Sequence, residues 1–372
     1  MTEREAFIAL NMIEGIGPVK VQALIDALGS PEAVFDPAVN DFREVQGIGE
    51  KLSESILAQR CEVDFTGELE HAKSLGVKII TPADADYPPA LKSIYDPPLA
   101  LYVSGSLLPR DKHALGIVGS RKCTYYGQST ADRLAYQLAQ TGFTVVSGLA
   151  RGIDEAAHEG ALKGQGRTVA VLGSALDALY PPENTELAER IAKSGAVVSE
   201  YPFGRQADRQ TFPYRNRIIS GLSMGVIVVE SGAKSGSLHT VDAAMEQGRS
   251  VFAVPGRIDS PASKGTNRLI KNGAKLVDNV ADILEEFELL LPPDKLVAPA
   301  PEGSARPEVP LSDAEQVLVK ALWAEALDVD SLARAAGLPS AKVSALLIGL
   351  EMKRVIKILP GRIVELAEDL KG

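Results

Sequence analysis

The loop over residues 230–237 has the composition of an anion-binding loop, because it places a lysine among glycines and serines. An apolar run over residues 224–229 precedes it, and helical spacing over residues 237–247 follows it. The pattern predicts a buried strand, a loop and a helix. A loop that opens a helix leaves backbone N–H groups unpaired at the positive end of the helix dipole. The residues predicted to face an anion are Lys234, Ser235, Gly236 and Ser237.

A second cluster, just upstream, combines positive charge with flat rings. Arg215, Asn216 and Arg217 supply two fixed cations and an amide, and Phe212 and Tyr214 lie beside them. Charge paired with aromatic surface is what a nucleic-acid strand or a nucleotide requires. The two clusters therefore predict a binding site for one of these ligands.

Both clusters depend on an α/β framework that is predicted from residue 113 onward. Helical segments alternate with apolar strands, which are predicted at residues 114–118, 144–147, 168–172, 196–199, 224–229, 250–254 and 275–277. This alternation predicts a Rossmann-like, doubly wound, mostly parallel sheet. Ligands of such sheets bind outside the carboxyl ends of the strands. The unusual residues that follow strands, and therefore share one rim, include Gly119, Ser120, Arg121, Gly148, Arg151 and Gly256.

Four cations near the ends of different strands are expected to line one pocket: Arg121, Arg215, Arg217 and Lys234. Arg121 follows a strand and a glycine, a position that suits bidentate contact with a phosphate. Arg217 has an alternative role, which is a structural ion pair with Glu200 or Glu230.

Several other kinds of site are disfavoured. Gly119 lacks the G-x-x-G continuation of a nicotinamide-dinucleotide fingerprint. Asp154 and His158 have helical i, i+4 spacing but no third metal ligand nearby, so structural roles are predicted for both. Ser237 and His239 are two residues apart on one helix and do not face each other, which excludes a nucleophile and base pair.

The composition of the 372-residue chain, with 45% hydrophobic and 24% charged residues, is ordinary for a soluble globular protein. A net charge of −10 confines any nucleic-acid contact to a local basic pocket. The two cysteines make no zinc-ligand spacing, and no stretch approaches the roughly 20 apolar residues of a membrane span. We therefore expect a cytoplasmic protein with no metal and no membrane association.

Smaller modules flank the core, giving predicted divisions at residues 1–62, 75–290, 291–310 and 311–372. Two Gly-apolar-Gly turns, at residues 15–17 and 47–49, resemble tandem helix-hairpin-helix motifs, which either bind phosphate or form tight corners. The Pro-rich third segment predicts a linker. The last predicts a winged helix, with helices over residues 312–324, 329–336 and 340–352 before a hairpin at 355–359 and 363–366. Contact with DNA and contact with protein both stay open for this module.

Signature sequences occur in order along the core: Gly119-Ser120-Arg121 with Tyr126-Gly127, the segment from Ser147 to His158, Phe212-Pro213 with Arg215-Asn216-Arg217, Ser235-Gly236-Ser237-Leu238 and Val254-Pro255-Gly256. With these residues the chain resembles the DprA (Smf) family of DNA-processing proteins. The resemblance implies a Rossmann-like core between a helix-hairpin-helix (SAM-like) domain and a winged helix. It also implies a cytoplasmic, non-enzymatic protein without cofactor, which forms a homodimer through the core. Such a protein binds single-stranded DNA, protects incoming DNA and loads the recombinase RecA in natural transformation.

The nucleic-acid-binding residues implied by the resemblance are Gly119, Ser120, Arg121, Gly148, Arg151, Phe212, Arg215, Asn216, Arg217, Lys234, Ser235, Gly236, Ser237, Gly256 and Asn267. The alternative is a nucleotide-binding hydrolase, because nucleoside-monophosphate phosphoribohydrolases have a similar core. Their loop reads PGG-x-GT with a following Glu, whereas residues 231–237 depart from it and Glu246 is a poor substitute. The DNA-binding protein is therefore favoured.

Overall fold

The computed structural model describes residues 1–287, 312–322, 327–339, 342–343, 346–347, 350, 355–359 and 363–366. The chain forms two compact units, Met1–Ala298 and Pro299–Gly372, and each is described by itself. The predicted linker over residues 291–310 and most of the predicted helix over residues 340–352 lie outside the described residues. The predicted domain boundaries stay a prediction.

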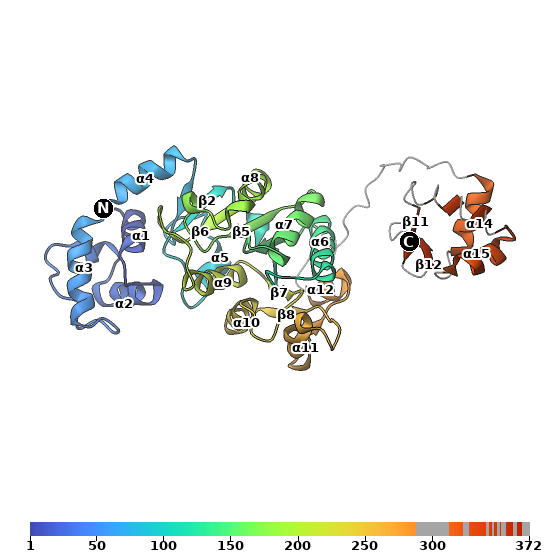
Figure 1. The fold of residues 1–372 in the computed structure, drawn as a ribbon. Helices are drawn as coiled ribbons and strands as arrows, with labels where there is room; N and C mark the ends of the chain where they lie inside the picture. Colours follow the sequence, from blue (N-terminus) through green and yellow to red (C-terminus); the bar gives the residue numbers. More distant parts are fainter. Residues whose placement is uncertain are drawn as a thin grey trace. The chain divides into compact units, whose positions relative to one another are not determined.

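A nine-stranded sheet forms the centre of the first unit, in the order β1-β2-β6-β5-β4-β3-β7-β8-β9 (Figure 1). Its strands are β1 (Lys78–Ile80), β2 (Leu101–Gly105), β3 (Ala114–Val118), β4 (Thr144–Ser147), β5 (Thr168–Val171), β6 (Ala196–Ser199), β7 (Gly225–Val228), β8 (Ser250–Ala253) and β9 (Lys275–Leu276). β2 pairs antiparallel with β1 and β6, and all the other pairs are parallel. The predicted fold class is confirmed. The strand order reverses between β3 and β7, so a ligand crevice is expected at their carboxyl ends.

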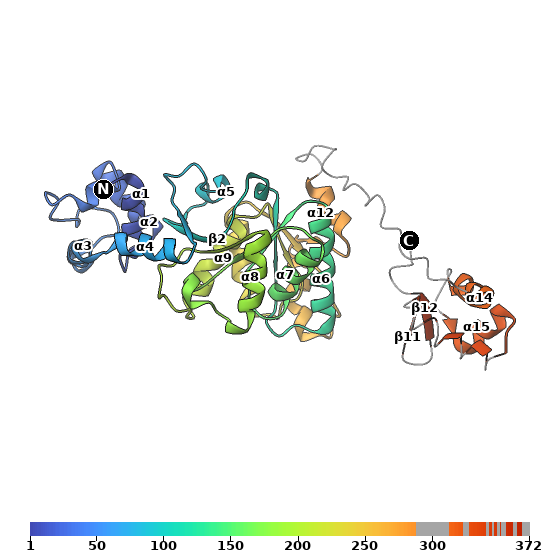
Figure 2. The ribbon, with the colours of Figure 1, turned by 90° about the horizontal axis from the view of Figure 1, so that it is seen from above.

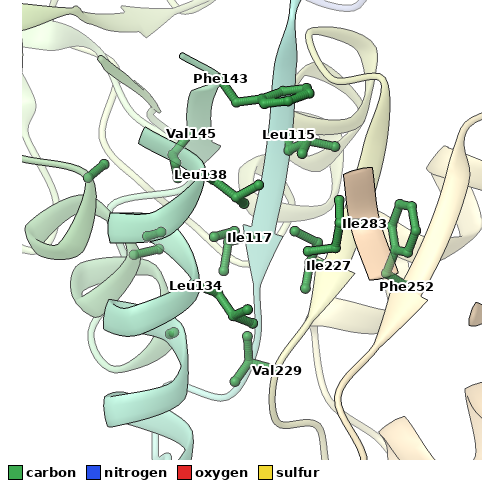
Figure 3. Packing of buried hydrophobic residues seen from close by; sticks show 14 of the residues in the cluster. Leu115, Ile117, Leu134, Leu138, Phe143, Val145, Ile227, Val229, Phe252 and Ile283 are labelled. Atoms are coloured by element: carbon green, nitrogen blue, oxygen red, sulfur yellow. The ribbon is translucent and has the colours of Figure 1, made fainter. Parts of the chain in front are cut away.

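Helices cover both faces of this sheet. One face carries α6 (Tyr125–Gln140), α7 (Ile153–Lys163), α8 (Thr185–Ser194) and α12 (Val280–Phe287), and Figure 2 shows the first three side by side. The other carries α5 (Pro89–Lys92), α9 (Thr211–Gly221), α10 (Ser237–Glu246) and α11 (Lys264–Lys271). Within β3, Leu115 and Ile117 face the first layer, and Val118 belongs to the opposite cluster. Figure 3 shows Ile117 beside Leu134 and Leu138 of α6. Burial on both faces explains why the strands read as continuous apolar runs.

Four helices precede the sheet in the same unit: α1 (Glu3–Met12), α2 (Pro18–Leu28), α3 (Glu50–Glu62) and α4 (Phe65–Ser74). The two predicted glycine turns open α2 and α3. Gly15 and Gly47 have φ angles of 86° and 81°, a left-handed conformation that favours glycine. Gly17 and Gly49 are the N-cap residues of the two helices. The tandem helix-hairpin-helix pattern is therefore present in the structure.

The second unit contains two described helices, α14 (Asp313–Leu322) and α15 (Val329–Ala336), and a small sheet. The sheet has the order β10-β12-β11 and consists of β10 (Leu327–Asp328), β11 (Ile356–Leu359) and β12 (Ile363–Leu366). Leu318, Leu332 and Val364 pack together in its core. This arrangement agrees with the predicted winged helix. In neither unit is any described helix long and apolar enough to cross a bilayer.

His158 packs beneath α7 against the sheet, the structural role predicted for it. Its ring is fully buried, and its Nδ1 lies 2.7 Å from the hydroxyl of Thr168. That hydroxyl donates its one hydrogen to the carbonyl oxygen of Val145, so it accepts a hydrogen bond from Nδ1–H of a neutral imidazole. Burial lowers the pKa of His158 to about 3.

This buried histidine makes the stability of the fold sensitive to acid. Between pH 6.5 and about 3 the unfolded chain binds a proton at His158 that the folded chain excludes, so the free energy of unfolding should fall as the pH is lowered. One proton corresponds to about 1.4 kcal/mol per pH unit. Urea unfolding of the parent and of His158→Gln at pH 6.5, 5.5 and 4.5 measures the effect. The variant should lose stability less steeply with acid, and equal slopes would contradict the assignment.

Candidate nucleic-acid interface

A cavity of about 570 Å³, here called the large cavity, lies at the carboxyl ends of β3 and β7, where the strand order reverses. Its walls are the loop after β3, the loop after β4 with the start of α7, the start of α9 and the start of α10. The predicted site residues that line it are Gly119, Ser120, Arg121, Phe212, Arg215, Asn216, Ser235, Gly236 and Ser237. Residues far apart in the sequence therefore meet at the expected rim.

A second recess of about 170 Å³, the small cavity, adjoins the large one. The residues that line both are Arg121, Lys122, Ala150 and Phe212. The predicted residues Gly148 and Arg151 line only the small cavity, and Arg151 forms an exposed ion pair with Glu183. The ring of Tyr180 also lines it, with its centroid 5.9 Å from that of Phe212 and the planes inclined by 53°. The small cavity therefore offers two aromatic rings beside positive charge.

Glu230, which follows β7, holds the loop that carries Arg121. Its backbone oxygen accepts a hydrogen bond from the N–H of Ser120 at 2.8 Å. Its buried carboxylate accepts two more from Thr124, from the backbone N–H at 2.8 Å and from the hydroxyl at 2.6 Å. Gly127 fits against this carboxylate, because a Cβ there would lie 2.5 Å from Glu230 Cδ. Glu230 therefore holds the loop of Arg121 in place through these hydrogen bonds. It is not the ion-pair partner of Arg217.

The exposed guanidinium of Arg121 lies over the ring of Phe212, with its carbon 4.5 Å from the ring centroid. Stacking orients the guanidinium and leaves the N–H donors at its edge available. Among the residues that the structure describes, no carboxylate lies within the 4.0 Å of an ion pair with Arg121. This cation is therefore free to bind a phosphate bidentately.

The start of α10 forms the wall opposite this loop. Ser235, Gly236 and Ser237 line the large cavity at the amino terminus of the helix, where the dipole is positive. The hydroxyl oxygens of Ser235 and Ser237 lie 2.9 Å apart, and Asn216 donates to the carbonyl oxygen of Gly236 at 3.3 Å. The bond from Asn216 ties the helix start to α9.

Arg215 lines the large cavity from beneath and is only 4% exposed. Its Nη1 donates to the carbonyl oxygen of Gly148 at 2.6 Å and also to that of Val171. Burial lowers its pKa to about 10, which still leaves it charged at neutral pH. Burial also raises the pKa of the neighbouring Asp154 carboxyl to about 6, although the charge of Arg215 acts to lower it. Arg215 therefore contributes positive electrostatic potential to the large cavity. Its N–H donors are used by the carbonyl oxygens of Gly148 and Val171.

The expectation that four cations line one pocket is wrong for Arg217 and Lys234. Arg217 forms ion pairs with Asp96 at 2.8 Å and Glu200 at 2.6 Å, and its side chain is 8% exposed. It follows Arg215 by two residues, about 200° around the helix, and therefore faces away from the cavity. The alternative ion pair with Glu200 is confirmed. Lys234 is exposed but lines neither cavity, because the loop turns the helix start rather than this side chain toward the recess.

Gly256 and Asn267 are bonded to each other rather than placed in the cavities. The N–H of Gly256 donates to Asn267 Oδ1 at 3.2 Å, and Asn267 Nδ2 donates back to the carbonyl oxygen at 2.9 Å. Neither residue lines the large or the small cavity. Their role in binding stays a prediction.

Sequence reasoning missed several residues of the two cavities. Lys122 and Arg209 add exposed cations, and their positions beside Arg121 and before Phe212 were usable signals. Tyr180 lies in a loop after β5, and only the folded chain brings its ring to Phe212.

Comparison with known families and structures agrees with this architecture. Residues 78–288 match the family model for DNA recombination-mediator protein A, residues 301–362 match the DprA winged helix domain, and residues 7–60 match the SAM-like helix-hairpin-helix tandem. Protein Smf from Synechocystis sp. is 35% identical over 389 residues, which cover 97% of this chain and 98% of that protein.

Two solved structures are also similar. DNA processing protein A from Streptococcus pneumoniae matches with a TM-score of 0.67 and 35% identity, covering 77% of this chain and 98% of that chain. DNA processing protein A from Helicobacter pylori, reported for its single-stranded DNA binding mode, matches with a TM-score of 0.52 and 30% identity. That match covers 58% of this chain and 98% of the other. This chain belongs to the DprA (Smf) family of DNA-processing proteins.

Proposed function

We propose that this protein binds single-stranded DNA, without sequence preference, in the two adjoining cavities at the carboxyl ends of β3 and β7. The observation that carries the proposal is Arg121, a cation without a carboxylate partner among the described residues, stacked on Phe212 between the two recesses. Phosphate binding and base stacking are thereby available within a few ångströms of each other. Similarity to the Helicobacter pylori protein, whose structure was reported for its single-stranded DNA binding mode, supports this choice of ligand.

The two cavities suit different parts of a nucleotide. The large cavity presents Arg121, Lys122 and Arg209 opposite the amino terminus of α10, which is an arrangement for phosphates. The small cavity presents the rings of Phe212 and Tyr180, on which an unpaired base can stack. A base inside a duplex has no free face to offer these recessed rings, so single strands are favoured.

The proposed role in the cell follows from family membership. The DNA-bound protein protects incoming DNA and loads RecA during natural transformation, and it acts in the cytoplasm as a homodimer through its core. The match to a recombination-mediator family supports this role. Co-precipitation of purified RecA with the DNA-bound protein, compared with RecA and DNA alone, would test the loading step.

The proposed role is binding rather than catalysis. Asp154 is the one carboxylate among the described residues of the large cavity, and it accepts a hydrogen bond from the N–H of Gly148 at 3.1 Å. Glu246, the substitute considered for a hydrolase, lines neither cavity. Within the described ranges, no group of three His, Cys, Asp or Glu side chains is placed to hold a metal ion. An assay for base release from nucleoside monophosphates tests the hydrolase alternative, and turnover above that of Arg121→Ala would support it.

Single-stranded oligonucleotides should bind more tightly than duplexes of equal length, with little dependence on sequence. Affinity should fall steeply with salt, because each phosphate contact releases counterions. Fluorescence anisotropy with labelled single strands and duplexes, at several salt concentrations, measures both effects. Equal affinity for the two forms would contradict the proposal.

Arg121→Ala and Arg217→Ala form a matched pair, since each removes one positive charge near α9. Arg121→Ala should weaken binding and reduce the salt slope by about 0.7, the contribution of one single-strand phosphate contact, without changing the melting temperature. Arg217→Ala breaks a buried ion pair and should lower the free energy of unfolding by roughly 3–5 kcal/mol, with an unchanged salt slope. Reversal of the two outcomes would move the phosphate contact from Arg121 to Arg217.

A further inference from the structure

The segment that joins β6 to α9, residues 200–210, forms part of the wall of the proposed DNA site. It contains Arg209, which lines the large cavity, and it leads directly into Phe212, which lines both cavities. We call it the β6–α9 loop. Its conformation decides where the side chain of Arg209 lies, so whatever holds the loop also shapes the site.

The amino-terminal helices α1 and α4 hold the first part of this loop. Asn11 of α1 donates to the carbonyl oxygen of Glu200 at 2.9 Å, across 189 residues of sequence. Glu68 of α4 accepts a hydrogen bond from the N–H of Phe203 at 3.0 Å. The ring of Phe203 also meets the ring of His71 edge-on, with centroids 4.6 Å apart. Side chains from two helices therefore contact the loop at Glu200 and Phe203.

The core adds its own contacts at the same place. Tyr102 of β2 packs edge-on against Phe203 at 5.2 Å, and Asp177 accepts hydrogen bonds from the N–H of Gly204 at 2.9 and 3.0 Å. The loop is thus clamped between the sheet and the amino-terminal helices. Loss of the helical contacts leaves the N–H of Phe203 without its acceptor and removes one side of the clamp.

We infer that the amino-terminal helices α1 and α4 are positioning elements for the DNA site, acting through Asn11 and Glu68 on the β6–α9 loop. The inference rests on the proposed function and deepens it. Neither residue lines the large or the small cavity, so they act through the loop and not on the ligand. Coupling of this kind is reciprocal: if docking of α1 and α4 favours binding, a bound single strand stabilises their docking.

The salt dependence of binding separates positioning from direct contact. The double variant Asn11→Ala, Glu68→Ala should bind single-stranded DNA about fivefold or more weakly, the lower range of typical coupling between sites. The salt slope should match that of the parent, because no phosphate contact is lost. Glu68→Gln keeps an oxygen acceptor for the N–H of Phe203 and should bind as the parent does.

Arg4→Ala is the matched control. Arg4 donates to the carbonyl oxygen of Ile79 at 2.8 Å and pairs with Asp84 at 3.3 Å, so it ties α1 to β1 without touching the β6–α9 loop. This variant should retain parental affinity. A loss equal to that of the double variant would show that general docking matters and would overturn the specific role of Asn11 and Glu68.

Hydrogen exchange on the unmodified protein gives a second readout that does not depend on the variants folding. Addition of an unlabelled single-stranded oligonucleotide should slow amide exchange in α1 and α4. Unchanged exchange there, parental affinity of the folded double variant, or a reduced salt slope in that variant would each overturn the inference while leaving the proposed function intact. Failure of the parent to bind single strands would instead reject the proposed function.

Discussion

The candidate site depends on the hydrogen bonds of Glu230, at the point where the strand order of the sheet reverses. Its buried carboxylate has no ion-pair partner among the described residues, and it is satisfied instead by the N–H and hydroxyl of Thr124, the N-cap of α6. An anion at a helix amino terminus is favoured by the dipole as well as by these bonds. Because Glu230 follows β7 and its partners follow β3, one residue joins the two halves of the sheet and fixes the loop of Arg121. Arg121 can remain without a carboxylate partner because the hydrogen bonds of Glu230 hold its loop in place.

Three arginines near this point have the same side chain but different roles, because they lie in different surroundings. Arg121 is exposed and stacked on a ring, Arg215 is buried under the cavity with its donors on carbonyl oxygens, and Arg217 is paired with two carboxylates. Only the first presents free donors to a ligand, while the second contributes potential and the third contributes stability. This division explains how a chain with a net charge of −10 can offer a local site for a polyanion.

Much of the fold and the location of the large cavity could be predicted from the sequence. Strands buried on both faces are continuous apolar runs, and the crevice rule then places the loop of Arg121 and the start of α10 on one rim. The predictions that failed, and the residues that were missed, concern side-chain directions and long-range contacts that no local sequence pattern encodes. The direction of Arg217 depends on the register of α9, which begins at Thr211, and the meeting of Tyr180 with Phe212 depends on how a distant loop packs. The grip of Asn11 and Glu68 on the β6–α9 loop likewise requires the folded chain.

We propose that unpaired bases stack on the rings of the small cavity while the backbone lies along the cations beside it. Photocrosslinking tests it most directly, with single-stranded oligonucleotides that carry 5-iodouracil and with mass spectrometry to locate the attached residue. Stacked aromatic residues react preferentially in such an experiment. Crosslinks should map to Phe212 and Tyr180, and an excess of unlabelled single strand, but not of duplex, should abolish them. Crosslinks confined to the winged helix or to the amino-terminal helices, with neither ring modified, would contradict the account.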